Sequence, residues 1–202
     1  ERRLAVRRSL HTDLERYLRY AADVNSLLEP RELELGFGFE EGDERGEPST
    51  LPAFDLAAGV RLRGRIDRVD VSERGDAVVY DYKSSRAPAA ARWIRDGDLQ
   101  VALYMRAVEG LLGLRVVGGF YQPLSGEDPR ARGVLEDDPA LGLECMTNDV
   151  REGAEVRELL AEATAAAVEA AAQAGRGELR ARPETCAFRG GCMYPTICRC
   201  ER

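Results

Sequence analysis

Two apolar segments joined by a short turn constrain the fold of this chain most strongly. Residues 58–71 mostly alternate between apolar and polar side chains, whereas residues 77–83 are nearly continuously apolar up to their last few positions. The five residues between them, 72–76, are typical of a hairpin turn. The alternation predicts a strand with one slip near Asp67, where we expect a bulge or a bend. The apolar run predicts a strand in the centre of a sheet.

The remaining segments predict an α/β fold with one mixed sheet flanked by helices. Apolar residues at helical spacing predict helices over 1–28, about 99–112 and 154–174, the second capped by Asp98 and ended by Gly113. Two more strands are expected over 33–39 and 115–123, while 41–53, 86–97 and 124–148 are expected to be loops or irregular. The order is helix, three antiparallel strands, helix, strand, helix.

At 202 residues the chain has the length of one domain. We expect an N-terminal helix within 1–29, a core over 30–123, and a C-terminal helix with a Cys-rich tail over 150–202. Because residue 1 is Glu and no signal-peptide pattern follows, we expect a fragment of a longer protein. No apolar run approaches the roughly 18 residues of a membrane span, so we expect a cytoplasmic protein without a membrane partner.

The net charge of −7 and the pI near 5.0 argue against nucleic-acid binding on overall charge alone. The distribution of charged residues over the surface matters more than the net charge, because a protein with an acidic face can have a basic face on its opposite side. Arginines crowd one segment around Arg65 and Arg68, whereas acids concentrate over 40–44 and 136–138. A basic face beside the predicted hairpin is therefore plausible.

Lys83 is the only lysine in a chain that otherwise uses arginine for positive charge. An ammonium is a compact charge with a tunable pKa, which makes Lys83 a candidate for chemistry. Asp67 and Asp81 lie about five residues from the turn on either side, so we expect them to be cross-strand neighbours. Asp81 and Lys83 share a face because side chains alternate along a strand. A surface ion pair on a hairpin is the simpler alternative.

Two adjacent carboxylates repel each other unless a cation lies between them. Oxygen ligands with open positions suit Mg²⁺ or Mn²⁺, and such a metal lowers the pKa of a bound water and neutralises phosphate charge. A neighbouring ammonium stabilises the charge that develops on a phosphate under attack. The spacing therefore indicates a site for phosphodiester hydrolysis.

Three segments in order resemble the PD-(D/E)XK nuclease superfamily and its restriction-endonuclease-like fold. They are Gly-Arg-Ile-Asp-Arg-Val-Asp over 64–70, Asp-Tyr-Lys-Ser-Ser over 81–85, and Gln100 with Tyr104. The pattern looks most like the RecB/AddB branch, the nuclease domains of helicase–nuclease machines. The resemblance implies a DNA nuclease acting on single-strand ends in double-strand-break repair, with a helicase motor as partner.

The resemblance also implies a role for each matching residue. Asp67, Asp81 and the Tyr82 carbonyl would bind the metal, and Lys83 would be the catalytic lysine. Gln100 and Tyr104, one helical turn apart, would face the site, although ordinary helix packing explains them equally well. Further expectations are phosphate contacts from Arg65 and Arg68 and a supporting acid at Glu34, with Glu32 as rival. His11 is expected to be a plain helix residue rather than the metal-binding His of some members.

The Cys-rich tail resembles the iron–sulfur staple of AddB-type nucleases. Cys186, Cys192 and Cys198 would be three ligands of a 4Fe-4S cluster, although the first interval is three residues longer than in the family. The usual upstream Cys is missing, which leaves Cys200 or Cys145 as substitutes. Zinc would accept the same thiolates, and free thiols are the remaining alternative.

Two other functions remain open on the sequence. A stand-alone nuclease of CRISPR adaptation belongs to the same superfamily and also carries a Cys tail, but it would begin with its own His motif. A non-cutting DNA-binding scaffold of a repair complex would share the fold, yet the intact set of Asp67, Asp81 and Lys83 favours an enzyme.

Overall fold

Six strands form one mixed sheet in the order β1-β4-β5-β6-β7-β8. The computed structural model describes residues 2–24, 26–40, 49, 51–85, 87–143 and 145–178. The sheet strands are β1 (Leu28–Phe37), β4 (Gly64–Ser72), β5 (Asp76–Lys83), β6 (Arg115–Pro123), β7 (Arg132–Glu136) and β8 (Val150–Arg151). Pairing is antiparallel for β1–β4, β4–β5 and β6–β7, and parallel for β5–β6 and β7–β8. The predicted mixed α/β sheet is confirmed, with β5 inside it.

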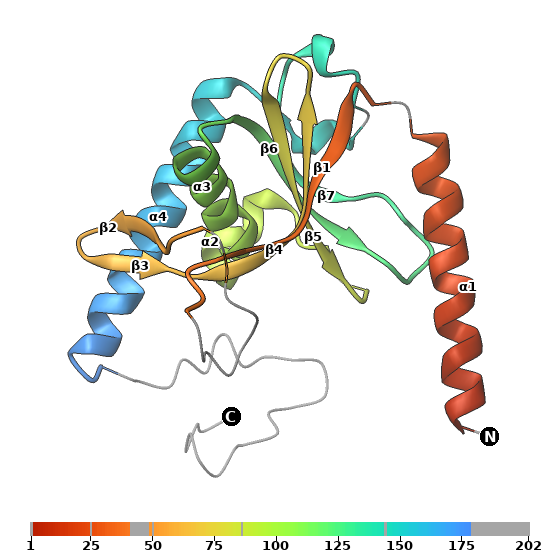
Figure 1. Cartoon of the computed structure of the whole chain (residues 1–202), viewed down its shortest axis with the longest axis horizontal. Helices are drawn as coiled ribbons and strands as arrows, with labels where there is room; N and C mark the ends of the chain where they lie inside the picture. The colour runs from red at the N-terminus through yellow and green to blue at the C-terminus, as the bar shows by residue number, and fades with distance from the viewer. Residues whose placement is uncertain are drawn as a thin grey trace.

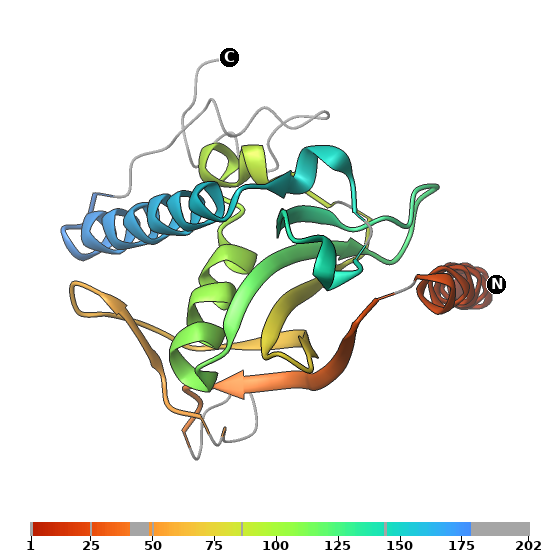
Figure 2. The ribbon, with the colours of Figure 1, turned by 90° about the horizontal axis from the view of Figure 1, so that it is seen from above.

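Helices lie on both faces of this sheet. The helices are α1 (Arg2–Asp23), α2 (Trp93–Asp96), α3 (Gln100–Leu112) and α4 (Gly153–Gly175), with single 3₁₀ turns at Ala90–Arg92, Pro139–Leu141 and Thr147–Asp149. Figures 1 and 2 show α3 and α4 on one face and α1 standing along the other. None of the described helices is long and apolar enough to cross a membrane.

The main core lies between the sheet and α3, and its packing holds α3 close to the sheet. Val79, Val101 and Met105 are fully buried there. Gly119 of β6 makes the close approach possible, because a Cβ at this position would lie 2.6 Å from the Met105 sulfur. The helix ends at Gly113, which has a φ of 66° that favours glycine. The start of α3 is thereby fixed over the carboxyl end of β5.

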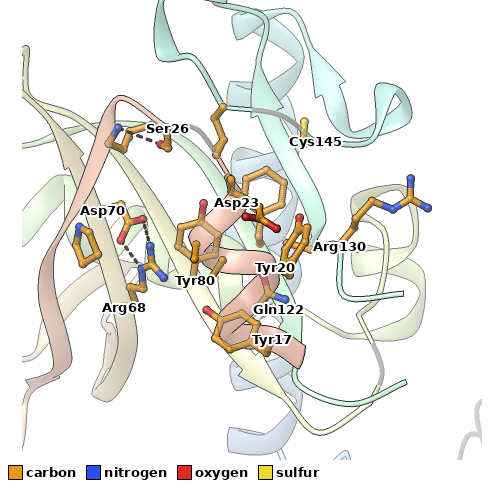
Figure 3. A pocket seen from close by; sticks show the side chains of 18 of the residues that line it. Tyr17, Tyr20, Asp23, Ser26, Arg68, Asp70, Tyr80, Gln122, Arg130 and Cys145 are labelled. Carbon is orange, nitrogen blue, oxygen red and sulfur yellow. Dashed lines mark hydrogen bonds and ion pairs between the residues drawn. The ribbon is translucent and has the colours of Figure 1, made fainter. Parts of the chain in front are cut away.

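Helix α1 contacts the opposite face of the sheet much less tightly. None of its residues is buried, and Leu4, Leu10, Leu14 and Leu18 are between 46% and 63% exposed. A cavity of about 740 Å³ separates its C-terminal half from the sheet (Figure 3). The helix predicted over 1–28 is therefore present, but it is shorter than predicted: α1 ends at Asp23, and Leu28 already belongs to β1.

The predicted strand over 58–71 is two strands in the structure. Residues Val60–Leu62 form β3, which pairs with β2 (Phe54–Ala57) in a separate two-stranded ribbon, and β4 begins only at Gly64. Alternation continues through both strands, so the sequence pattern does not reveal the break. Near the predicted slip, Ile66 and Val69 enter the same core cluster although they are three positions apart, so the two-residue period is broken there. The register shift in the β1–β4 pairing lies elsewhere, between Pro30 and Glu32 of β1.

Two regions predicted to be irregular contain regular elements. Residues 124–148 include β7, which pairs with β6, and residues 86–97 include α2, whose Trp93 is fully buried. Leu99 rather than Asp98 is the N-cap of α3, and no side chain caps this helix. Burial against the rest of the molecule explains α2 and β7, since both are too short to be stable alone.

Candidate active site

The two acidic residues of the hairpin lie side by side where the β4–β5 ladder ends. The recorded pairs run from Val71 opposite Ala77 to Arg68 opposite Tyr80, so Asp67 and Asp81 follow the last pair. The charge of Asp67 contributes to raising the pKa of Asp81, although burial is the larger cause. The structure thus brings together the two carboxylates that the sequence placed on neighbouring strands.

Asp67 reaches across to the backbone of β5. Its Oδ2 accepts a hydrogen bond of 2.6 Å from the N–H of Tyr82. On the other side of β5, the Lys83 carbonyl accepts from the N–H of Leu124. Because the polar groups of successive residues in a strand point to opposite neighbours, the Tyr82 carbonyl is directed toward Asp67 as well. This geometry adds a third oxygen to the two carboxylates.

Asp81 is almost completely buried, and Lys83 beside it is partly exposed. The side chains are 3% and 36% exposed, with the Lys83 Nζ 2.5 Å from the Asp81 Oδ2. Burial raises the pKa of Asp81, while the hydrogen bond and the charge of the Lys83 ammonium oppose the shift. The ammonium is the cation that this buried oxygen contacts, and no second hydrogen bond to the oxygen is present among the described residues.

Helix α3 supplies a chain of polar contacts to Lys83. The Lys83 ammonium donates to Gln100 Oε1 at 2.9 Å, and Gln100 Nε2 donates to the Tyr104 hydroxyl at 3.3 Å. Gly64 allows this arrangement, because a Cβ there would lie 2.9 Å from the Tyr104 ring and hydroxyl. The structure therefore brings Gln100 and Tyr104 to the site, as the sequence predicted.

Tyr121 is a component that the sequence reasoning missed. It lies opposite Asp81 in the parallel β5–β6 pairing, and its ring centroid is 5.3 Å from Lys83 Nζ. Its hydroxyl donates to the Asp98 carbonyl and accepts from the N–H of Val101, which ties the start of α3 to β6. Only the pairing of β5 with β6, which places Tyr121 opposite Asp81, identifies Tyr121 as part of the site. This pairing cannot be read from the sequence.

Arg68 does not reach this site. It points to the rear face of the sheet, where it binds both oxygens of Asp70 at 2.5 Å and stacks 5.1 Å from the ring centre of Tyr80 (Figure 3). Asp70 is only 3% exposed, so the Arg68 guanidinium is committed to a buried pair. The phosphate contact expected of Arg68 next to Asp67 therefore has no geometric basis, because neighbouring residues of a strand face opposite ways.

The remaining predicted residues make no contact with the two acids that the structure shows, or lie outside the described residues. Glu34 lies opposite Asp67, between the pairs Leu33–Arg68 and Leu35–Ile66, but it has a φ of 52° and an exposed side chain 4.0 Å from Arg65. His11 is 81% exposed on α1, 4.0 Å from Glu15. Cys145 is half-buried on the rear face, and burial raises the pKa of its thiol to about 11. The tail cysteines lie outside the described residues: Cys186, Cys192, Cys198 and Cys200.

The donor set fits a divalent cation, with two carboxylates rather than three. Among the described residues, no group of three or more His, Cys, Asp or Glu side chains gathers closely enough to hold a metal. Asp67, Asp81 and the Tyr82 carbonyl remain as candidate oxygen ligands. Mg²⁺ commonly takes one or two protein carboxylates and completes its shell with water and phosphate oxygens. A cavity of about 240 Å³ beside Lys83 and Gln100 leaves room for such groups.

Comparison with known proteins gives one assignment. Residues 2–199 match the family model described as the PD-(D/E)XK nuclease superfamily, which spans nearly the whole chain. A search of curated proteins finds no match.

Proposed function

Because the chain belongs to the PD-(D/E)XK nuclease superfamily, we propose that it is a deoxyribonuclease that uses Mg²⁺ or Mn²⁺. Phosphodiester hydrolysis and the use of a divalent metal are properties of the superfamily; DNA as substrate and the choice of metal are the proposal. The observation that supports it is the buried Asp81 carboxylate, which lies next to a second carboxylate, Asp67, and contacts the only lysine of the chain.

Each residue of the site has a proposed role in this reaction. Asp67, Asp81 and the Tyr82 carbonyl would hold the cation, which lowers the pKa of a bound water and neutralises charge on the phosphate. Lys83 would donate to a non-bridging phosphate oxygen as negative charge accumulates on it. Gln100, held by Tyr104, would keep the Lys83 ammonium in place through its 2.9 Å hydrogen bond.

The overall reaction is hydrolysis of one ester bond of the DNA backbone. The oxygen of a water molecule bonds to phosphorus, one phosphorus–oxygen ester bond breaks, and the leaving sugar oxygen ends as a hydroxyl. The Tyr121 ring lies 5.3 Å from the Lys83 ammonium, and the turn before α3 lines the same cavity.

The proposed biological setting is the nuclease part of an AddB/RecB-like helicase–nuclease. In this setting a helicase motor feeds single-strand DNA ends to the site during double-strand-break repair. The supporting observation is the order of the three motifs in the sequence, with Asp67, Asp81-Tyr82-Lys83 and Gln100 now gathered in one place. Purification of the complete natural protein with its associated subunits would test the setting, and the absence of ATP-dependent DNA unwinding would contradict it.

The experiment that tests the hydrolytic activity combines metal removal with matched acid variants. The full chain is incubated with end-labelled single-strand DNA in EDTA, Mg²⁺, Mn²⁺ or Ca²⁺. We expect cleavage with Mg²⁺ or Mn²⁺ only, and its loss in Asp67→Asn and Asp81→Asn. Asp128→Asn is the control, since Asp128 is an exposed acid paired with Arg130. Equal cleavage by the site variants and the control would refute the proposal.

The tail cysteines carry a separate proposal, a 4Fe-4S cluster. Four thiolates are the ligands that such a cluster requires, and the Cys192–Cys198 interval is the one that resembles the family. Elemental analysis of anaerobically purified protein tests it directly. Iron and acid-labile sulfide at about four each per chain would support a cluster. If the analysis finds zinc and no iron, the proposal of a cluster is wrong and the cysteines form a zinc site.

A further inference from the structure

Positive charge without acidic partners is concentrated in the first half of α1. Residues 2–12 contain Arg2, Arg3, Arg7 and Arg8 and no acid, in a chain whose net charge is −7. All four arginines are exposed, and no described acid is recorded in an ion pair with them. The second half of the same helix differs, since Arg16 pairs with Asp13 and Arg19 with Glu15.

The basic half of α1 extends beyond the end of the sheet that carries the candidate active site. Tyr17 is level with the end of β5, because its hydroxyl lies 3.0 Å from that of Tyr82, between Asp81 and Lys83 in sequence. From Tyr17 back to Arg2 the helix continues for about 22 Å at 1.5 Å per residue. Figure 1 shows α1 running past the ends of β5 and β6 toward the N-terminus.

We propose that Arg2, Arg3, Arg7 and Arg8 form a phosphate-binding arm that holds a nucleic-acid strand leaving or approaching the site. This inference rests on the proposed nuclease function and adds to it a surface that contacts the substrate backbone. A stacked strand carries one phosphate about every 3.4 Å, so the arm, which extends about 9 Å from Arg2 to Arg8, spans roughly three phosphates. Arginine suits this role because its planar fork binds phosphate oxygens bidentately.

The distribution of charge on the arm favours a polyanion as its binding partner over an apolar protein surface. Leu4 and Leu10 are also exposed there, at 59% and 57%, which raises the alternative of an apolar protein partner. Arg3 and Arg7 lie one turn apart on one row of the helix, while Arg8 projects from another side. Charges on several sides of a helix suit a backbone that bends around it, whereas an apolar docking face would be flanked by charge on its edges only.

The test measures binding of the full chain to a fluorescent 20-nucleotide single strand in EDTA, as a function of KCl concentration. Each neutralised phosphate contributes about 0.7 to the slope of log K against log salt for single strands. The variant with all four arginines changed to Gln should therefore lose roughly 2 to 3 units of slope and bind more than tenfold more weakly at low salt. Arg16→Gln with Arg19→Gln is the matched control and should change the slope by less than 1 unit.

The proposal would be overturned by an unchanged slope in the fourfold variant, by an equal loss in the control, or by a loss that follows Leu4→Ser with Leu10→Ser instead of the arginines. Arginine-dependent binding of phosphatidylserine vesicles without binding of the oligonucleotide would also overturn it. Because the measurement contains no divalent metal, it gives an answer even if the chain proves not to cut DNA. Conversely, retained cleavage of a dinucleotide by the fourfold variant would confirm that the arm lies outside the hydrolytic site.

Discussion

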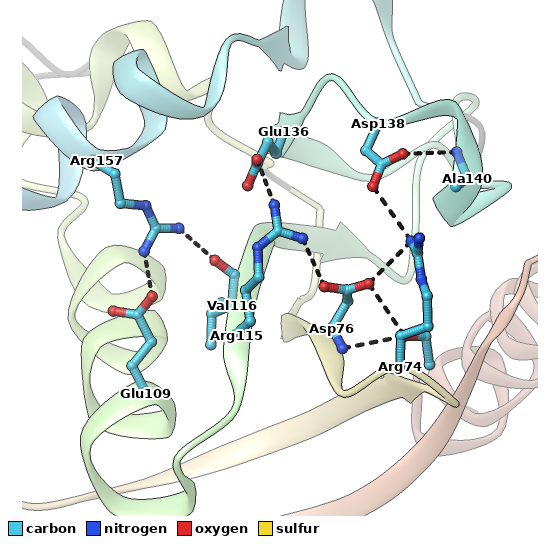
Figure 4. A network of polar contacts seen from close by, with 10 residues as sticks. Arg74, Asp76, Glu109, Arg115, Val116, Glu136, Asp138, Ala140 and Arg157 are labelled. Carbon is cyan, nitrogen blue, oxygen red and sulfur yellow. Dashed lines mark hydrogen bonds and ion pairs between the residues drawn. The ribbon is translucent and has the colours of Figure 1, made fainter.

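Both ends of β5 carry a buried aspartate beside a cation, yet the two ends are built differently. At the hairpin end, Asp76 is 6% exposed and binds Arg115 at 2.7 Å and Arg74 at 3.1 Å, with Ser72 completing its contacts (Figure 4). At the other end, Asp81 has one cation beside it, the Lys83 ammonium, which lies 2.5 Å from its Oδ2.

The surroundings of the two aspartates extend this contrast. Arg115 and Arg74 continue to Glu136 and Asp138, so positive and negative charges alternate through the network in Figure 4. Asp81 instead faces a second carboxylate, Asp67, whose charge raises its pKa further. A carboxylate that two arginines share stabilises the fold, whereas two neighbouring carboxylates with one ammonium retain capacity for a further cation.

The largest expected effect separates the ends by activity. Lys83→Met should reduce metal-dependent hydrolysis by about 10²–10³-fold or more, since it removes a donor to the charge that develops on phosphate. Asp76→Asn should leave the rate per folded molecule unchanged. Single-turnover cleavage of labelled DNA measures both. A comparable loss of rate in Asp76→Asn would remove the functional distinction between the two ends.

The second largest expected effect concerns stability, and here the hairpin end of β5, with Asp76, is the sensitive one. Asp76→Asn should lower the free energy of unfolding by about 2–3 kcal/mol, because two arginines lose their shared carboxylate while they stay partly hydrated. Urea unfolding followed by circular dichroism measures the change. Glu73→Gln, in the same turn, is the control and should shift the value by less than about 0.5 kcal/mol. Equal stability of the two variants would show that the contacts of Asp76 contribute little to the free energy of unfolding.

A third prediction concerns the positioning of the lysine from α3. Gly64→Ala should displace the Tyr104 ring, because the new methyl group would lie 2.9 Å from it. We expect kcat to fall about tenfold through loss of the Gln100 orientation, with a smaller loss of stability. Tyr104→Phe tests the hydroxyl alone and should have the smaller effect. An unchanged kcat in Gly64→Ala would show that Gln100 keeps its place without Tyr104.

The smallest effect is the pH dependence of stability in the metal-free protein. Burial raises the folded pKa of Asp81 above the unfolded value near 4, so the folded state binds more protons than the unfolded state between these two values. The stability contributed by this group is therefore lost as pH rises through that window. Asp81→Asn should remove this pH dependence. Unfolding measured from pH 4 to 8 checks this, and an equal pH dependence in Asp81→Asn would contradict it.

The elements that the sequence predicted correctly are those with a long, uninterrupted pattern. The hairpin of β4 and β5, helices α3 and α4 and strand β6 all follow from periodicity and turn residues, and the order of acids around the turn placed Asp67 beside Asp81. The segments that it missed, β7 and α2, are short, and the β3–β4 break falls within a continuous alternation. Short elements form only where tertiary packing covers them, so they leave weak signals in a sequence.

The residues with the chemistry for this site can be identified from residue type and spacing: two acids at matched distances from a turn, the only lysine, and a Gln–Tyr pair one helical turn apart. The groups that join them follow from the folded arrangement of the strands. It brings Tyr121 under Lys83 through a parallel register, turns Arg68 to the rear face and buries Asp81 beside Lys83. Residue type and spacing are local properties, whereas burial and the partners of a buried charge depend on strands that are distant in the chain.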